Sequence, residues 1–342
     1  MKILGIESSC DDTSISIIDN NKNIIVNETI SQNQIHKDYK GVVPELAARN
    51  HVLYIDKILK SILKKQQIRI TDIDLIAATV GPGLVGGLLV GLTFAKTLSQ
   101  VNAIPFIGVN HLEGHALTVR LTNKVEYPFL LLLVSGGHSN FYFISGINDY
   151  KFLGGTLDDA LGEAFDKVAN ILGLDFPGGA QLESLAMKGD YKKVCLPKPL
   201  INVKNLDMSF SGLKTAALNC KNGVDKNNIS RSDLAASFQK SVADVLCKKI
   251  SLAIDVCNKE FFNYKNVVVS GGVAANNYLR KKIIETVKLK DKLAFFPPTD
   301  LCADNGAMIA WAGYELYRVG VRSKLNIKAK PRWPLESIGE RV

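Results

Sequence analysis

Short apolar runs that alternate with helical patterns constrain the fold of this chain more than any other feature. Each run is bounded by polar or glycine-rich residues, which is typical of strands buried in a sheet. A helical repeat of apolar residues follows Pro44, and a glycine-rich helix is expected between the last two runs. The strands of the first half are predicted at residues 1–9, 14–19, 23–27, 74–80 and 105–110. The alternation predicts an α/β fold in which crossover helices join parallel strands.

The second half of the chain starts the same order again. An apolar run over 129–138 contains a Gly-Gly turn, and a returning strand over 140–145 completes a predicted hairpin. A long amphipathic helix over 234–256 leads to a buried strand, a Gly-Gly turn and a helix start over 266–277. A last helix is expected over 305–318. The repetition predicts a duplicated fold with two lobes around a cleft.

Three turns that follow apolar strands have the composition of phosphate-binding turns. They lie at Ser8–Thr13, Ser135–His138 and Ser270–Gly272. Small residues let backbone N–H groups approach an anion closely, and the third turn precedes a helix whose amino terminus favours negative charge. One such turn alone is more often an ordinary hairpin or crossover turn, but three in one chain favour a phosphate ligand. The sequence contains neither the P-loop nor the dinucleotide-binding signature, so neither explains the turns.

Two histidines in the sequence His-Leu-Glu-Gly-His have the spacing of metal ligands on a helix. Positions i and i+4 share a helix face, so His111 and His115 can reach one metal ion, and Asp304 is a candidate third ligand. A solvated or helix-capping histidine pair is the alternative. A metallopeptidase is disfavoured, because Glu113 lies two residues after His111, about 200° around the helix, and cannot easily act on a metal-bound water.

Composition and charge narrow the class of protein further. The chain has 42 Lys and Arg against 33 Asp and Glu, a net charge of +9, which fits either an anionic partner such as nucleic acid or simply solvated lysines. The six cysteines form no Cys-x-x-Cys pair and no signal peptide is evident, which predicts reduced thiols in a cytoplasmic protein. Residues 75–95 lack charge but contain Pro82 and several glycines, so a strand, a turn and a helix are expected there instead of a membrane span.

A set of sequence motifs runs in order through residues 1–335. It comprises IESSCDDTS, HKDYKGVVPELAARNH, GPGLVGGLLVG, HLEGH, LLVSGGH, GEAFDKVA, DFPGGA, SFSGLKTA, VVVSGGVAANNYLR, LCADNGAMIA and PRWPL. The set resembles the TsaD family of bacterial tRNA N(6)-adenosine threonylcarbamoyltransferases, formerly labelled O-sialoglycoprotein endopeptidases, in the actin, sugar-kinase and Hsp70-like superfamily. The resemblance implies a duplicated actin-like (ribonuclease-H-like) ATPase fold, with two lobes around a nucleotide cleft. The implied lobes are residues 1–110 with 305–342, and residues 111–304 with a helical or loop-rich insertion near 180–235.

The resemblance implies a transfer reaction and the molecules that take part in it. Family members pass the threonylcarbamoyl group from threonylcarbamoyl-AMP to the exocyclic amine of the adenosine 3′ of the anticodon, in tRNAs that read ANN codons, and AMP leaves. They work with an inactive paralogue, TsaB, and a P-loop ATPase, TsaE. They bind one divalent metal ion per subunit, usually Fe²⁺, with Zn²⁺ as the alternative. No membrane partner is implied.

The resemblance also implies roles for individual residues. His111, His115 and Asp304 match the metal ligands of the family. Asp11 matches the acidic residue that would orient the amine or take its proton, and Asp12 stands where many relatives have Glu. The residues implied to bind the adenylate are Val134, Ser135, Gly136, Gly137, His138, Asp166, Gly179, Glu183 and Asn276.

Basic residues are the candidate tRNA contacts, and two other function classes stay open. Lys214, in a loop that resembles a family loop, can meet tRNA phosphate, and residues 280–282 and the basic tail are further candidates. A metal-dependent peptidase is motivated by the histidine pair. A non-catalytic scaffold that binds nucleotide is the third hypothesis, although a degenerate scaffold need not retain the metal-binding and acidic residues together.

Overall fold

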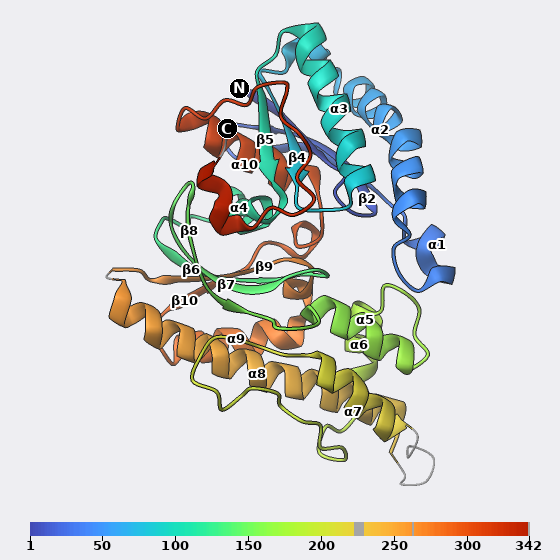
Figure 1. The fold of residues 1–342 in the computed structure, drawn as a ribbon, viewed down its shortest axis with the longest axis vertical. Helices are drawn as coiled ribbons and strands as arrows, with labels where there is room; N and C mark the ends of the chain where they lie inside the picture. The colour runs from blue at the N-terminus through green and yellow to red at the C-terminus, as the bar shows by residue number, and fades with distance from the viewer. Residues whose placement is uncertain (222–228, 262, 341–342) are drawn as a thin grey trace. The chain divides into compact units, whose positions relative to one another are not determined.

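Two five-stranded mixed β-sheets organise the chain, as the computed structural model shows (Figure 1). The structure describes residues 1–221, 229–261 and 263–340. Helices connect parallel strands within both sheets, so the predicted α/β class is confirmed.

The first sheet comprises β1 (Lys2–Glu7), β2 (Asp12–Asp19), β3 (Ile24–Ser31), β4 (Leu75–Gly81) and β5 (Phe106–Asn110). Its strand order is β3-β2-β1-β4-β5. The hairpin pairs β1–β2 and β2–β3 are antiparallel, whereas β1–β4 and β4–β5 are parallel. All five strands predicted for the first half of the chain are therefore confirmed.

The second sheet comprises β6 (Phe129–Val134), β7 (Ser139–Gly146), β8 (Asp149–Gly155), β9 (Asn266–Ser270) and β10 (Leu293–Phe295). Its order, β8-β7-β6-β9-β10, repeats that of the first sheet strand for strand. β6 is antiparallel to β7 and parallel to β9, as β1 is to β2 and β4. The predicted duplication is confirmed. Strands β8 and β10 were not predicted. Polar residues and glycines interrupt the apolar run in β8, and β10 has only three residues.

The chain divides into two units, each built around one of these sheets. The first unit comprises Met1–Lys124, Gly146–Tyr150 and Ala303–Val342, and the second comprises Val125–Ser145 and Lys151–Cys302. The first unit extends beyond the expected boundary at residue 110 through one further helix, and it also includes Gly146–Tyr150. Helix α4 (His111–Thr122) packs against α10 (Gly306–Arg318), and this contact keeps it in the first unit.

Helices cover both faces of the first sheet. Figure 1 shows α2 (Pro44–Gln66) and α3 (Val85–Asn102) on one face, and α4 and α10 on the other. The short helix α1 (Asn33–His36) precedes α2. The uncharged stretch 75–95 forms β4, a turn and the start of α3, as predicted. Within the described residues, no helix has both the length and the apolar character needed to cross a membrane.

The second sheet packs its apolar side chains against long helices. Leu130 and Leu132 of β6 share one buried core with Phe238 and Leu246 of α8. The predicted polar insertion near 180–235 contains two short helices and long loops, although its first helix begins within the preceding glycine turn. The helices of this unit are α5 (Leu161–Ile171), α6 (Gly179–Ala186), α7 (Ser211–Lys221), α8 (Arg231–Glu260) and α9 (Asn277–Lys288).

Helix α10 approaches β1 and β2 so closely that its contact points must be glycine. A Cβ atom on Gly5 would lie 2.1 Å from the carbonyl oxygen of Gly306 and 2.6 Å from the nitrogen of Ala310. A Cβ atom on Gly306 would lie 2.5 Å from the nitrogen of Ser16. The Gly306 N–H donates a hydrogen bond to Ser14 Oγ at 2.8 Å. These contacts fix the start of α10, and the segment just before it, against the sheet.

We expect Gly5→Ala to lower the free energy of unfolding by about 1–3 kcal/mol, because α10 must move away from β1 to admit the methyl group. Gly41→Ala is the matched control, since no atom lies within 4 Å of its Cβ position, and its effect should stay within about 0.5 kcal/mol. Urea denaturation of both variants measures the difference. Equal stabilities would contradict the proposed packing constraint.

Candidate functional site

The carboxyl ends of three parallel strands lie at one edge of the first sheet. Ile6 of β1 pairs with Ala78 of β4, which pairs in turn with Gly108 of β5. The last residues of β1 and β5 are the fully buried polar residues Glu7 and Asn110. In open α/β sheets, ligands bind beyond the carboxyl ends of the strands. This edge is therefore the candidate site of the first unit.

Helix α4 begins directly at this edge with His111. The side-chain oxygen of Asn110 caps the helix by accepting hydrogen bonds from the N–H groups of Leu112 (2.9 Å) and Glu113 (3.3 Å). His115 follows one turn later on the same face, and the centroids of the two imidazole rings lie 4.8 Å apart. The cap thus positions the helical turn that carries both imidazoles.

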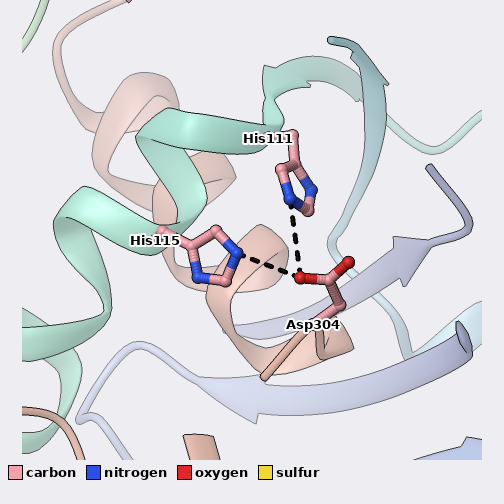
Figure 2. A group of neighbouring side chains, drawn as sticks. All are labelled: His111, His115 and Asp304. Atoms are coloured by element: carbon pink, nitrogen blue, oxygen red, sulfur yellow. Dashed lines mark hydrogen bonds and ion pairs between the residues drawn. The ribbon is translucent and has the colours of Figure 1, made fainter. Parts of the chain in front are cut away.

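Asp304, just before α10, joins the two histidines (Figure 2). Its Oδ1 lies 3.5 Å from His111 Nε2 and 3.0 Å from His115 Nε2. One ligand atom from each of the three residues lies within 4.8 Å of the other two. Two imidazole nitrogens and one carboxylate oxygen form a donor set that suits Fe²⁺ or Zn²⁺. The residues therefore fit a divalent metal ion.

The electrostatic environment of His111 favours a positive charge at this place. Burial lowers the pKa of its imidazole, but the carboxylates of Asp304 and Glu7 outweigh burial and raise the pKa to about 9. Metal ligation requires the neutral imidazole, so a metal ion must displace this proton when it binds. The same two carboxylates then stabilise the metal ion's charge.

Glu113, which lies between the histidines, serves the helix packing. Its side chain is fully buried, and its Oε1 accepts a hydrogen bond from the Tyr150 hydroxyl at 2.6 Å. A metallopeptidase needs a carboxylate that can act on a metal-bound water. The contact with Tyr150 gives Glu113 a structural role and provides no support for the peptidase hypothesis.

The turn between β1 and β2 places two carboxyl groups in the same unit as the metal donors. Burial raises the pKa of Asp11, a hydrogen bond with the Cys10 side chain opposes this, and the charge of Asp304 raises it further. Burial and the charges of Asp304 and Asp11 raise the pKa of Asp12 to about 7. The buried Oδ1 of Asp12 has no hydrogen-bond partner among the described residues. Carboxyl groups with raised pKa values suit proton transfer near neutral pH.

In the second unit, the turn from Ser135 to His138 joins β6 to β7. The Ser135 N–H donates to the His138 carbonyl oxygen at 2.8 Å, and the His138 N–H donates to Ser135 Oγ at 3.2 Å. No atom lies within 4 Å of a Cβ position on Gly136 or Gly137. The turn is therefore closed by its own hydrogen bonds while its tip offers open space for a ligand.

Two other glycines bring neighbouring segments against this turn. Gly271, after β9, has φ +96°, and a Cβ atom there would lie 2.4 Å from the Val134 carbonyl oxygen. A Cβ atom on Gly162, in the first turn of α5, would lie 2.7 Å from the Ser135 carbonyl oxygen. Because β6 and β9 are parallel neighbours, their carboxyl ends meet here. The turns 134–138 and 270–272 therefore pack against each other.

The remaining residues implied to bind adenylate lie around α6 and α9, and several make internal contacts. Asp166 Oδ1 accepts a hydrogen bond from the Gly178 N–H at 2.8 Å, and no atom lies within 4 Å of a Cβ position on Gly179. Glu183 Oε1 accepts from the Asn277 N–H at 2.8 Å. Glu183 thus links α6 to the amino terminus of α9.

Asn276 uses both ends of its side chain within the protein. Its Oδ1 accepts from the Leu279 N–H at 2.9 Å and caps α9, while its Nδ2 donates to Gln239 Oε1 at 3.0 Å. The structure therefore gives Asn276 and Glu183 structural roles that the sequence did not indicate.

The candidate tRNA contacts differ in their exposure. Lys214 is exposed on the first turn of α7. Arg280 is held internally, because its guanidinium donates to the carbonyl oxygens of Ala274 (2.5 Å) and Pro297 (2.7 Å). Lys281 beside it is exposed. Lys282 is half-buried and forms an ion pair with Glu285 at 3.0 Å. Of these three basic residues, Lys281 is the best placed to reach a polyanion.

Comparison with known proteins decides which family shares these features. The sequence profile of TsaD, tRNA N6-adenosine threonylcarbamoyltransferase, matches residues 23–311. The enzyme of that name from Rickettsia rickettsii (strain Sheila Smith) is 51% identical over 341 residues, which cover 99% of both chains. The one from Rickettsia bellii (strain OSU 85-389) is 52% identical over 340 residues, 98% of this chain and 99% of the relative. The chain belongs to the TsaD family. Membership identifies it as a transferase of the tRNA N6-adenosine threonylcarbamoyl type.

Solved structures show that this TsaD-family chain has an actin-like fold. HypF of T. kodakarensis aligns with a TM-score of 0.62 and 17% identity, over 93% of this chain and 48% of HypF. Component A of the Acidaminococcus fermentans (R)-2-hydroxyglutaryl-CoA dehydratase aligns with a TM-score of 0.55 and 17% identity, over 92% of this chain and 98% of the other. The fold implied by the sequence resemblance is confirmed.

Glu7, whose role no sequence motif indicates, orients His111. Glu7 Oε1 accepts from the Ser9 N–H at 2.6 Å, and its Oε2 accepts from the Thr79 hydroxyl and lies 3.1 Å from His111 Nδ1. With a neutral imidazole, this carboxylate favours the proton on Nδ1 and leaves the Nε2 lone pair for a metal ion. The indication that the sequence offers for Glu7 is a glutamate at the end of an apolar run.

We expect Glu7→Gln to weaken metal binding by about 10- to 100-fold, because the His111 Nδ1–H loses its charged acceptor. Competition with a chelator, with Zn²⁺ as the probe, measures the affinity. Glu28→Gln is the matched control, since it removes a carboxylate that pairs with Lys65 on the surface. If the two variants bind Zn²⁺ equally well, Glu7 does not orient the ligand.

The carboxylate of Asp158 anchors the start of α7, the helix that carries Lys214. It accepts hydrogen bonds from the hydroxyls of Ser209 (2.5 Å) and Ser211 (2.6 Å) and from the N–H groups of Phe210 and Ser211. Burial raises the pKa of Asp158, but these hydrogen bonds outweigh burial and lower it to about 2. The ionised carboxylate therefore stabilises the folded state.

We expect Asp158→Asn to lower the Tm at neutral pH. The lost contribution is fully present above the unfolded-state pKa of about 4 and disappears as the pH falls to about 2. The gap in Tm between the wild type and the variant should therefore narrow below about pH 4. Calorimetry over this pH range measures the gap. A gap that does not change with pH would contradict the assignment.

Proposed function

We propose that this TsaD-family chain transfers the threonylcarbamoyl group from threonylcarbamoyl-AMP to tRNA. The acceptor is the exocyclic N6 amine of the adenosine 3′ of the anticodon, in tRNAs that read ANN codons. The chain belongs to this family. The observation that supports the proposal most is that one unit of the chain contains both a His-His-Asp donor set and two carboxyl groups of raised pKa.

The proposed reaction is an acyl transfer from a mixed anhydride. The N6 nitrogen forms a bond with the carbamoyl carbon, and the bond from that carbon to the phosphate oxygen breaks. AMP leaves with the bonding electron pair, and the amine loses one proton. An aromatic amine is a weak nucleophile, so the reaction requires a stabilised leaving group, a stabilised oxyanion and a group that accepts the proton.

We assign the proton acceptor to the turn after β1. Asp11 is the candidate, as the sequence indicates, and burial raises its pKa toward the range in which a carboxylate accepts a proton efficiently. Asp12 beside it has a pKa of about 7 and is the second candidate. Burial and the nearby charge of Asp304 are the physical causes in both residues.

We assign the adenylate to the second unit. The turn Val134–His138 would hold the phosphate, because Gly136 and Gly137 are exposed and the space at their Cβ positions is open to an anion. Gly179 offers open space at the start of α6, and Asp166 supports the turn before it. Glu183 and Asn276 would shape this region through their contacts with α9.

We assign the metal to His111, His115 and Asp304, with Fe²⁺ as the expected ion and Zn²⁺ as the alternative. When bound, such an ion supplies a Lewis acid that stabilises negative charge on an oxygen atom of the donor substrate. Glu7 orients His111 toward it. We further propose that the chain acts in the cytoplasm with TsaB and TsaE.

A single-turnover assay tests the transfer. Labelled threonylcarbamoyl-AMP is mixed with unmodified tRNA and the protein, with and without the partner proteins, and label in tRNA is counted. We expect transfer by the wild type and a loss of about 100-fold or more in Asp11→Asn, because general base catalysis contributes about 10²- to 10⁴-fold. Asp19→Asn, which removes a surface carboxylate on β2, is the control. Adenylate binding without any transfer would favour the scaffold hypothesis instead.

Metal analysis tests the donor set separately from the reaction. We expect His111→Ala combined with His115→Ala to abolish the bound metal, because two of the three donors are lost. Inductively coupled plasma mass spectrometry of the purified protein measures metal content and identifies the ion. The His36→Ala variant serves as a control, since His36 is a buried histidine outside the donor set. Unchanged metal content in the double variant would refute the assignment.

A further inference from the structure

The segment that follows α10 concentrates positive charge in the first unit. Between Glu315 and Glu336 the chain contains no acidic residue. It contains six basic residues, Arg318, Arg322, Lys324, Lys328, Lys330 and Arg332. We call residues 318–332 the basic strap. The like charges of these side chains repel one another, and an anion that lies against them relieves this repulsion.

The backbone of the basic strap is held along β5 and β4. The Ser323 N–H donates to the Phe106 carbonyl oxygen at 3.3 Å, and Ser323 Oγ accepts from the Gly108 N–H at 2.9 Å. The Lys330 N–H donates to the Val80 carbonyl oxygen at 2.8 Å. Figure 1 shows the segment, in red, following these strands. The strap is thus an ordered part of the unit, and a ligand need not order it.

The carboxyl-terminal end of the strap reaches residues that contact or directly precede His111. The Gly83 N–H donates to the Pro331 carbonyl oxygen at 3.1 Å, and a Cβ atom on Gly83 would lie 2.5 Å from the carbonyl oxygen of Ser9. Ser9 Oγ lies 3.0 Å from His111 Nδ1. The side chain of Asn110, which caps α4, donates to the Trp333 carbonyl oxygen at 2.9 Å. Two chains of contacts therefore connect the strap to His111.

The charges of the strap are available to a ligand. Five of the six side chains are exposed, and Lys330 is half-buried. None of the six forms an ion pair with a carboxylate in the part of the chain that the structure describes. Arg322 lies over the Tyr317 ring at 3.6 Å from its centroid, and Lys330 lies over the Trp333 ring at 4.5 Å. The two rings restrict these cations and so lower the entropic cost of binding an anion.

We propose that the basic strap binds the phosphate backbone of the tRNA beside the adenosine that is modified. The inference rests on the proposed function, which makes tRNA the substrate. Contacts between Lys or Arg side chains and phosphates carry no sequence information, so they suit an enzyme that accepts several tRNAs. An anionic membrane or an acidic protein could also meet this charge. The contacts with Ser9 and Asn110 favour the tRNA, because they place the strap next to the residues assigned to the reaction.

The test compares tRNA affinity at several salt concentrations. One variant of the full-length protein combines Arg322→Gln, Lys324→Gln, Lys328→Gln and Arg332→Gln. The control combines Lys57→Gln, Lys60→Gln, Lys64→Gln and Lys65→Gln on α2, which removes the same charge from the same unit. Fluorescence polarisation with an unmodified tRNA transcript gives the dissociation constant from about 50 to 300 mM salt, the range over which phosphate contacts change affinity most visibly.

The expected results follow from counterion release. Each lost phosphate contact should reduce the slope of log K against log salt by about 0.7–0.9, so the strap variant should lose about 3 in slope. Its affinity should fall on the order of 100-fold at physiological salt, whereas the control should change far less. A charge-retaining variant, Arg322→Lys with Arg332→Lys, should keep the wild-type slope. That result would show that the strap variant loses affinity because it loses charge and not because it misfolds.

Other outcomes overturn the inference in distinguishable ways. If the strap variant and the control lose equal affinity and slope, the strap does not contact tRNA. If vesicles that contain phosphatidylserine bind the wild type but not the strap variant, while both proteins bind tRNA equally well, the strap is a membrane-binding surface. If the wild type binds no tRNA, with or without its partner proteins, the proposed function itself fails.

Discussion

The candidate metal site depends on the close approach of α10 to the first sheet. Asp304 and His115 are 189 positions apart in sequence, yet their side chains meet at 3.0 Å. They meet because Gly306 lies directly against Ser14 and Ser16, where a methyl group would not fit. The same helix buries Trp311 and its apolar neighbours against the sheet. Burial of this apolar surface therefore stabilises the position of a carboxylate that local interactions alone could not hold.

Duplication produced two sheets of one topology whose strand ends carry different chemistry. In the first unit, Glu7 and His111 lie at or next to the strand ends, and the carboxylates there favour a cation. In the second unit, the equivalent turn after β6 is Ser-Gly-Gly-His, and Gly271 after β9 packs against it. Exposed backbone N–H groups favour an anion. The duplicated fold thus provides a candidate cation site and a candidate phosphate site from the same arrangement of strands.

Most of the fold could be predicted because its signals are local in sequence. Apolar runs located eight of the ten described strands, and the i, i+4 spacing placed His111 and His115 on one helix face. Strands β8 and β10 were not predicted, because polar residues and glycines interrupt the apolar run of β8 and β10 has only three residues. The role of Glu7 was not predicted, because its partners Thr79 and His111 are more than 70 positions away in sequence. Arg280 looked like a surface cation, but carbonyl oxygens at the ends of two loops hold it.

The sequence by itself determined the α/β class, the duplication, the glycine turns and the family, because each depends on residue patterns within short segments. Only the tertiary structure decided which distant residues share a site. It joined Glu7 to His111 and the strap residue Pro331 to Gly83, and it brought Asp304, a ligand candidate from the sequence, within 3.0 Å of His115. The physical reason is that these contacts are formed by close packing of α10 and its extension on the sheet. Packing distances of this kind depend on the whole unit, and no periodicity in the sequence encodes them.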